Sequence, residues 1–196
     1  MRPEAPAALP ILRSRLVGQL LALLAADEER WWTIDQLAAR TGGAYPTLTR
    51  EIRRLAEAGL VETEEVGRSK RVRVNTASPF HRPLAELMLR AFGPLVVVGE
   101  EFRGSAGVDW VAIYGSWAAR YEGEVGPAPN DIDVLVLGRA DRDEVFEAAQ
   151  RAEYRLGLPV NTTIRRTEDW EGADDAFARQ LKASPLVTVP LSAEEA

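Results

Sequence analysis

The chain has 196 residues, 46% hydrophobic and 28% charged, which suits one large or two small domains with well-filled cores. It contains no cysteine and no apolar run as long as a membrane span. Disulfides and thiolate zinc sites are therefore excluded, and a cytoplasmic location is expected. The net charge of −6 is uneven, because residues 1–78 carry +2 and residues 79–196 carry −8.

Three helices and a hairpin are predicted in the first 78 residues. Leucines at helical spacing predict a helix over 11–26. Thr33 and Gln36 have the pattern of an N-terminal capping box for a second helix, and Pro46 fits the first turn of a third. Two strand-like runs follow, at 60–66 and 71–75, joined by a basic turn.

This order of three helices and a basic hairpin resembles the winged helix-turn-helix of bacterial transcription regulators. The resemblance implies that the second helix supports the third, whose exposed N-terminal half enters the major groove of double-stranded DNA. Arginine can pair with guanine, and hairpin cations can contact phosphate, so binding should depend strongly on salt. The candidate DNA-binding residues are Tyr45, Thr47, Arg50, Arg54, Arg68, Lys70, Arg71 and Arg73.

Acidic residues interrupt this basic surface. Glu51, Glu57 and the run Glu62–Glu65 lower its positive potential, so we expect modest affinity from a monomer and action as a homodimer. The alternative is a winged helix that contacts protein, with its arginines simply solvated. A domain boundary is expected at 77–79, which assigns 1–78 to the DNA-binding domain.

Two helices are predicted to link the domains. Apolar spacing predicts the first over 80–92. Pro94 and the helical spacing of Leu95, Val98 and Phe102 favour a second over 95–103, although Leu-Val-Val-Val also suits a buried strand.

The sequence after this point predicts strand, tight turn, helix, loop and strand. The strand 110–114 leads to Gly115 and Ser116 at the start of a short helix, where backbone can approach a ligand and free N–H groups attract phosphate. After the loop 122–130, Asp131 and Asp133 lie two residues apart and so share one face of the next strand. A pair of carboxylates can hold Mg²⁺ together with substrate phosphates.

Gly115, Ser116, Asp131 and Asp133 resemble the Gly-Ser…Asp-x-Asp pattern of the nucleotidyltransferase superfamily, which includes DNA polymerase beta and the minimal (MNT-type) enzymes. The resemblance covers roughly the second half of the chain. It implies an α/β domain with a mixed sheet over 79–196, linker helices included. It also implies catalytic and metal-binding roles for both aspartates, and a nucleoside triphosphate as ligand or substrate at Gly115 and Ser116. Arg120, one turn further, is either a triphosphate contact or a surface cation.

The third strand of this domain, expected over 158–164, departs from the family pattern. Active relatives usually carry a third carboxylate there, whereas Asn161 stands at the corresponding position. An amide coordinates Mg²⁺ weakly and cannot act as a base, so the domain is either a slow transferase or a nucleotide-binding domain without chemistry. Glu168 and Asp169 are possible substitutes, but we expect them to favour the start of a helix capped by Thr167.

The remaining elements complete an α/β domain. Asp141 has the pattern of an N-cap for a helix ending near Leu156. A helix over 174–182 and an edge strand within 184–189 are expected after it.

Three functions follow as expectations. The first is a DNA-binding regulator whose nucleotidyltransferase-like domain senses or processes a nucleotide with Mg²⁺. The second is an active transferase acting on a protein, drug or nucleotide, and by analogy some MNT-type proteins are antitoxins that modify a toxin-like partner. The third is a protein-interaction module with a vestigial pocket.

Overall fold

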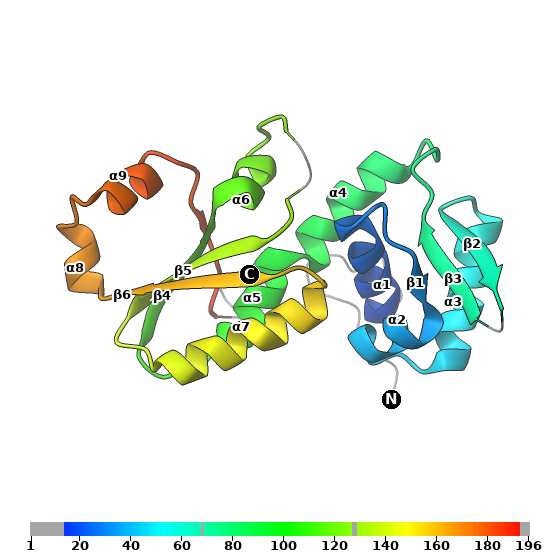
Figure 1. Ribbon diagram of the computed structural model, residues 1–196, viewed down its shortest axis with the longest axis horizontal. Coiled ribbons are helices and arrows are strands. Elements are labelled where there is room, and N and C mark those ends of the chain that lie inside the picture. The colour runs from blue at the N-terminus through cyan, green and yellow to red at the C-terminus, as the bar shows by residue number, and fades with distance from the viewer. Residues whose placement is uncertain (1–13, 68, 127–128, 193–196) are drawn as a thin grey trace. The chain divides into compact units, whose positions relative to one another are not determined.

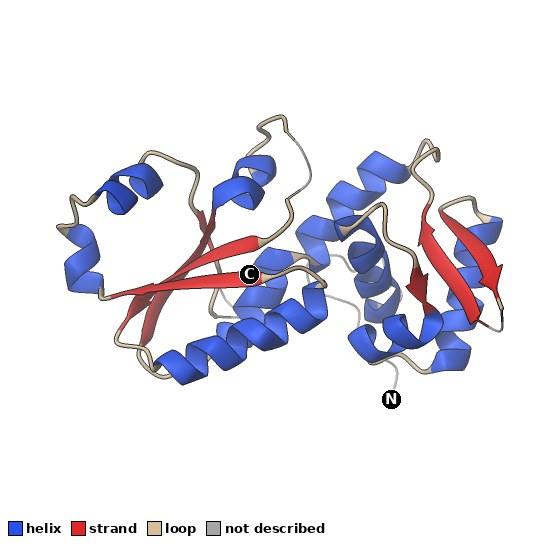
Figure 2. Ribbon diagram, in the orientation of Figure 1, coloured by secondary structure: helices blue, strands red, loops and turns tan. Residues whose placement is uncertain are grey.

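The computed structural model describes residues 14–67, 69–126 and 129–192, and the chain divides into two compact units between Gly93 and Pro94. Unit 1 precedes this division and unit 2 follows it. Both contain helices and a sheet, so the α/β class predicted from the sequence is confirmed (Figures 1 and 2). Within the described residues, no helix is both long and apolar enough to cross a membrane.

Unit 1 consists of four helices and a three-stranded antiparallel sheet of order β1-β3-β2. Leu20, Trp32 and Leu48 lie at the centre of its core and are almost fully buried. Its elements are α1 (Arg15–Ala26), β1 (Trp32–Thr33), α2 (Ile34–Thr41), α3 (Tyr45–Glu57), β2 (Val61–Val66), β3 (Ser69–Val74) and α4 (His81–Phe92).

Local sequence explains how the helices of unit 1 begin and end. The Thr33 side chain accepts from the Gln36 N–H and Gln36 reaches back to Thr33, which confirms the predicted capping box. Gly42 then ends α2 in the left-handed conformation. Helix α4, which the sequence prediction grouped with the second domain, packs through Met88 and Phe92 against α1, so the division falls one helix later than residue 78.

Unit 2 is built on a mixed four-stranded sheet of order β6-β5-β4-β7. Strand β5 runs antiparallel to β4 and parallel to β6, while the short β7 pairs with the other edge of β4. Its elements are α5 (Pro94–Phe102), β4 (Val108–Tyr114), α6 (Gly115–Tyr121), β5 (Ile132–Gly138), α7 (Arg142–Leu156), β6 (Val160–Arg165), α8 (Thr167–Glu171), α9 (Ala176–Lys182) and β7 (Val187–Thr188). The helical choice for the segment after Pro94 is therefore confirmed.

The two faces of this sheet are different. Helices α5 and α7 lie side by side on one face, where Val134 and Val136 of β5 contribute to the main core (Figure 1). Asp133 and Leu135 alternate with these valines and so point to the opposite face. There Leu135 joins a smaller apolar cluster with α9, which leaves the Asp133 end of that face to polar side chains.

Candidate functional sites

The first candidate site is the surface of unit 1 formed by α3 and the β2–β3 hairpin. Helix α3 buries Leu48 and Ile52, as predicted, and turns the opposite stripe outward. The Arg50 and Arg54 side chains are 62% and 68% exposed, Tyr45 is exposed at the start of the helix, and Thr47 is half-buried. The proposed recognition residues on α3 are thus accessible to a partner.

The α3 arginines share one acidic partner. Glu51 lies 2.9 Å from the Arg54 guanidinium and 3.5 Å from that of Arg50, and only 15% of its own side chain is exposed. A glutamate in this position holds both arginines against the helix and cancels part of their charge. Ion pairs this exposed on the arginine side are weak, so phosphate or a base edge can replace the carboxylate at small cost.

The hairpin neutralises its cations in the same way. Direct cross-strand register places Glu62 opposite Arg73, Glu64 opposite Arg71 and Glu65 opposite Lys70. The corresponding N–O distances are 2.8, 2.7 and 3.9 Å. The candidate phosphate contacts Lys70, Arg71 and Arg73 therefore lie on one strand but face compensating acids, while Arg68 lies outside the described residues.

Removing the shared acid should strengthen any contact of α3 with DNA. Glu51→Gln frees Arg50 and Arg54 without changing side-chain size, so we expect DNA affinity to rise several-fold and its dependence on salt to become steeper. Fluorescence anisotropy across a salt series measures both. Glu57→Gln, which removes the partner of Arg53, is the matched control. Weaker DNA binding by Glu51→Gln would contradict the assignment of these arginines.

The second candidate site lies where β4, β5 and β6 of unit 2 meet the start of α6. Gly115 has φ +73°, and an ideal Cβ on it would lie 2.5 Å from Asp133 Oδ2. Only glycine fits this turn, because both the backbone conformation and the neighbouring carboxylate exclude a side chain. The predicted approach of the Gly-Ser turn to the acid pair is thus present for Gly115 and Asp133.

Asn161 bridges the two carboxylates. Its Nδ2 donates to Asp131 Oδ2 at 3.0 Å and to Asp133 Oδ1 at 3.2 Å, across the parallel register that pairs Asp133 with Asn161. Burial raises the pKa of Asp133, the Asn161 hydrogen bond lowers it, and the charge of Asp131 raises it. The expected shared face for these three residues is confirmed.

Tyr114 and Thr163 border this group and were not predicted as site residues. The Tyr114 hydroxyl lies 3.2 Å from Thr163 Oγ1, and the Tyr114 backbone pairs directly with Asp133. Burial raises the pKa of Tyr114, and the nearby aspartates raise it further, while the Thr163 hydrogen bond opposes them. Strand alternation places Thr163 on the Asn161 face, so a two-residue period in the sequence was the available indication.

The remaining predicted ligands lie less centrally. Ser116 is the second residue of α6 and its side chain is exposed. Arg120 Nη1 donates to the Glu124 carbonyl at 2.5 Å, and its guanidinium packs beside Gly126. Arg120 therefore holds the loop that follows α6, the less specific of the two roles expected for it.

The acids after β6 do not supply a third carboxylate. Glu168 forms a 2.6 Å ion pair with Arg139 on another part of the sheet edge. The expectation that Thr167 caps the next helix is wrong, because α8 begins at Thr167 itself and its hydroxyl donates to Asp109 Oδ2 at 2.6 Å. Asp109 lies at the bulge of β4, a contact that no local pattern reveals.

The donor set fits a hard cation of low affinity. Two carboxylates and one amide offer oxygen atoms, and Mg²⁺ commonly combines such ligands with water and phosphate. Among residues 14–67, 69–126 and 129–192, no group of three or more His, Cys, Asp or Glu side chains could hold a metal ion. The amide oxygen of Asn161 reaches the acids only if the side chain turns over, exchanging its donated hydrogen bonds for a ligand bond.

Gly115→Ala should disrupt this site. Its left-handed backbone costs roughly 1 kcal/mol for a side chain, and the new methyl must displace the Asp133 carboxylate. We expect lower stability by thermal unfolding and loss of Mg²⁺-dependent nucleotide binding by calorimetry. Gly123→Ala is the matched control, since Gly123 also has positive φ but no atom lies within 4 Å of its ideal Cβ. Unchanged nucleotide binding by Gly115→Ala would place the ligand elsewhere.

Comparison with known proteins identifies one similarity. Residues 15–78 match the model of a family described as HVO_A0114. A comparison with curated proteins finds no match. The matched range begins with α1 and ends just after β3, so it contains the helices α1 to α3 and the hairpin. Over this part of unit 1, and less than half of its length, the chain is similar to the HVO_A0114 family.

Proposed function

We propose that this protein is a DNA-binding transcriptional regulator, and that a nucleotide bound with Mg²⁺ in unit 2 sets its affinity for DNA. The observation that carries the proposal is the exposed arginine stripe of α3. It follows a glycine turn after α2 and precedes a hairpin bearing further cations, as in a winged helix-turn-helix.

The geometry of unit 1 supports DNA as the partner in two ways. The side of α3 opposite its buried stripe carries long donors that can reach base edges, and the hairpin presents Lys70 and Arg71 for phosphates. The intramolecular ion pairs explain how an acidic protein can do this without strong non-specific attraction to DNA. Binding exchanges each glutamate for a phosphate or base, which favours modest and sequence-dependent affinity.

The DNA-binding half of the proposal is tested by selecting duplexes from a randomised pool with the purified protein. We expect an enriched sequence whose affinity falls steeply with added salt. Absence of enrichment, or an affinity indifferent to salt, would contradict DNA recognition and favour the alternative in which unit 1 contacts protein.

The geometry of unit 2 supports a nucleotide as the ligand. Gly115 brings the backbone of the α6 start against Asp133, and Asp131 lies on the same Asn161 amide. Backbone N–H groups beside two carboxylates suit a polyphosphate with its divalent ion, and Mg²⁺ bound there would neutralise phosphate charge. Calorimetry with ATP, CTP, GTP and UTP plus Mg²⁺ tests this directly. Absence of heat with all four would favour a vestigial pocket.

An active nucleotidyltransferase is the second candidate, favoured by the paired Asp131 and Asp133 carboxylates. An acceptor hydroxyl would attack the α-phosphorus, the bond to the bridging oxygen would break, and pyrophosphate would leave. Asn161 cannot take the acceptor proton, so a slow rate is expected. Release of labelled pyrophosphate by the wild type, abolished in Asp131→Ala, would establish this activity.

A further inference from the structure

Helix α7 carries two exposed aromatic side chains that its own unit does not cover. Phe146 is 58% exposed and Tyr154 is 49% exposed, whereas Val145, Ala149 and Ala152 on the other side of the helix are buried. Phe146, Gln150 and Tyr154 follow one another at intervals of four residues. They therefore form one ridge on the outer surface, with an aromatic ring at each end.

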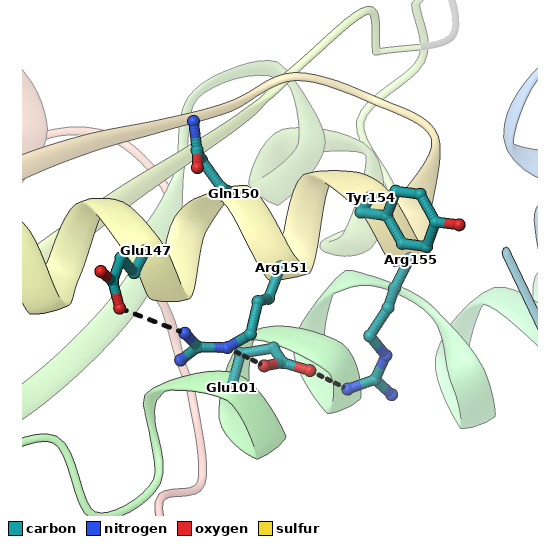
Figure 3. A pocket seen from close by; sticks show the side chains of 6 residues that line it. All are labelled: Glu101, Glu147, Gln150, Arg151, Tyr154 and Arg155. Carbon is teal, nitrogen blue, oxygen red and sulfur yellow. Dashed lines mark hydrogen bonds and ion pairs between the residues drawn. The ribbon is translucent and has the colours of Figure 1, made fainter. Parts of the chain in front are cut away.

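A second ridge beside the first carries opposite charges. Glu147 is four residues before Arg151, whose guanidinium lies 2.9 Å from Glu101 of α5 and 4.0 Å from Glu147 (Figure 3). These contacts orient Arg151 while leaving 54% of its side chain exposed. An open hollow of about 600 Å³ lies along the same ridge, lined by Glu101, Glu147, Gln150, Arg151, Tyr154 and Arg155 (Figure 3).

We propose that this surface of α7 binds a second copy of the chain, with the two α7 helices antiparallel about a two-fold axis near Gln150. Phe146 of each copy then meets Tyr154 of the other, because the two residues lie equally far from Gln150. In the same arrangement Glu147 of each copy lies within reach of Arg151 of the other. An isologous interface requires this kind of self-complementarity.

Charge complementarity favours α7 over the other apolar surface of the chain. In unit 1 a hollow of about 420 Å³ is lined by Ala58, Leu60, Phe80, Pro83, Leu84 and Leu87. Antiparallel pairing of α4 about Glu86 would bring Arg82 opposite Arg90 and Glu86 opposite itself, so like charges would meet. The α7 surface instead pairs acid with base at both symmetry-related contacts.

The size of the surface predicts a weak, reversible dimer. Four aromatic side chains bury about 150–250 Å² each. Their sum is below the roughly 1,600 Å² of a standard stable interface. Dissociation is therefore expected in the micromolar range, where nearby binding of two copies on a palindromic DNA site would favour the dimer. The interface itself does not depend on the proposed function.

Sedimentation velocity of the full chain across a concentration series tests the proposal. We expect a monomer–dimer equilibrium that Phe146→Ser weakens at least tenfold and Phe80→Ser leaves unchanged. Phe80 is the matched control, being an equally exposed aromatic in unit 1. A monomer at all concentrations, or a dimer weakened by Phe80→Ser and not by Phe146→Ser, would overturn the proposal.

A charge exchange makes the test independent of any loss of stability. Glu147→Arg alone and Arg151→Glu alone should each prevent self-association, because like charges then face each other twice. An equimolar mixture of the two variants should form a heterodimer, since both contacts again pair acid with base. Thermal unfolding confirms that each variant is folded before mixing. Failure of two folded variants to associate, when the wild type does, would rule out the antiparallel arrangement.

Discussion

Asn161→Asp should lower the stability of the protein in a chelator and raise it in Mg²⁺. Without metal, two donated hydrogen bonds are lost and a third carboxylate faces Asp131 and Asp133. We expect a cost of about 1–2 kcal/mol after allowing for solvent around these partly exposed groups. That corresponds to roughly 4–16 °C for a domain of this size. With Mg²⁺, the added ligand should increase cation affinity about tenfold or more.

Differential scanning calorimetry in a chelator and in Mg²⁺ measures this reversal of sign. Gln180→Glu is the matched control, because it also converts an exposed amide of unit 2 to a carboxylate, away from the acid pair. The control should shift little in either buffer. If Asn161→Asp is as stable as the wild type in the chelator, the bridging amide contributes nothing. If Mg²⁺ gives no added stability, the acid pair does not hold the ion.

Replacing Arg50 and Arg54 together by alanine should abolish most sequence-specific DNA binding. A good contact from arginine to a base edge contributes about 1–3 kcal/mol. Losing both should weaken binding of the selected duplex roughly 100-fold or more. The effect on folding should be small, because both side chains are exposed and paired only with Glu51 on the same helix.

Arg90→Ala supplies the control for this pair of substitutions. Arg90 is an exposed arginine of unit 1 with a glutamate one turn earlier, but it lies on α4 rather than on α3. Anisotropy at constant salt should give nearly wild-type affinity for Arg90→Ala. Equal loss in the control and in the double variant would mean that general charge, rather than α3, determines binding.

Elements with strong local patterns were predictable from the sequence. The Thr33 cap, the helix after Pro94 and the shared face of Asp133 and Asn161 each follow from short-range rules of capping, proline placement and strand alternation. These rules act over a few residues and need no knowledge of what packs on the segment. The outline of the acid site was therefore available before the structure.

Contacts between distant segments were not predictable. Trp32 and Thr33 form a strand only because β3 passes beside them. His81 is buried with its Nε2 2.9 Å from Glu28 Oε1, although 53 residues separate them. Arg120 points to the Glu124 carbonyl because of how the following loop folds, which no periodicity encodes. Side-chain direction at such positions is decided by tertiary packing.

The proposed link between the two sites can be measured in one titration. The affinity of the selected duplex is determined with and without the bound nucleoside triphosphate and Mg²⁺, for the wild type and for Asp133→Ala. We predict that the nucleotide changes the wild-type affinity by about 5–150-fold, the usual range of coupling between sites. Asp133→Ala should bind the duplex normally and show no response. A wild-type affinity that is identical with and without saturating nucleotide would contradict regulation of DNA binding by unit 2.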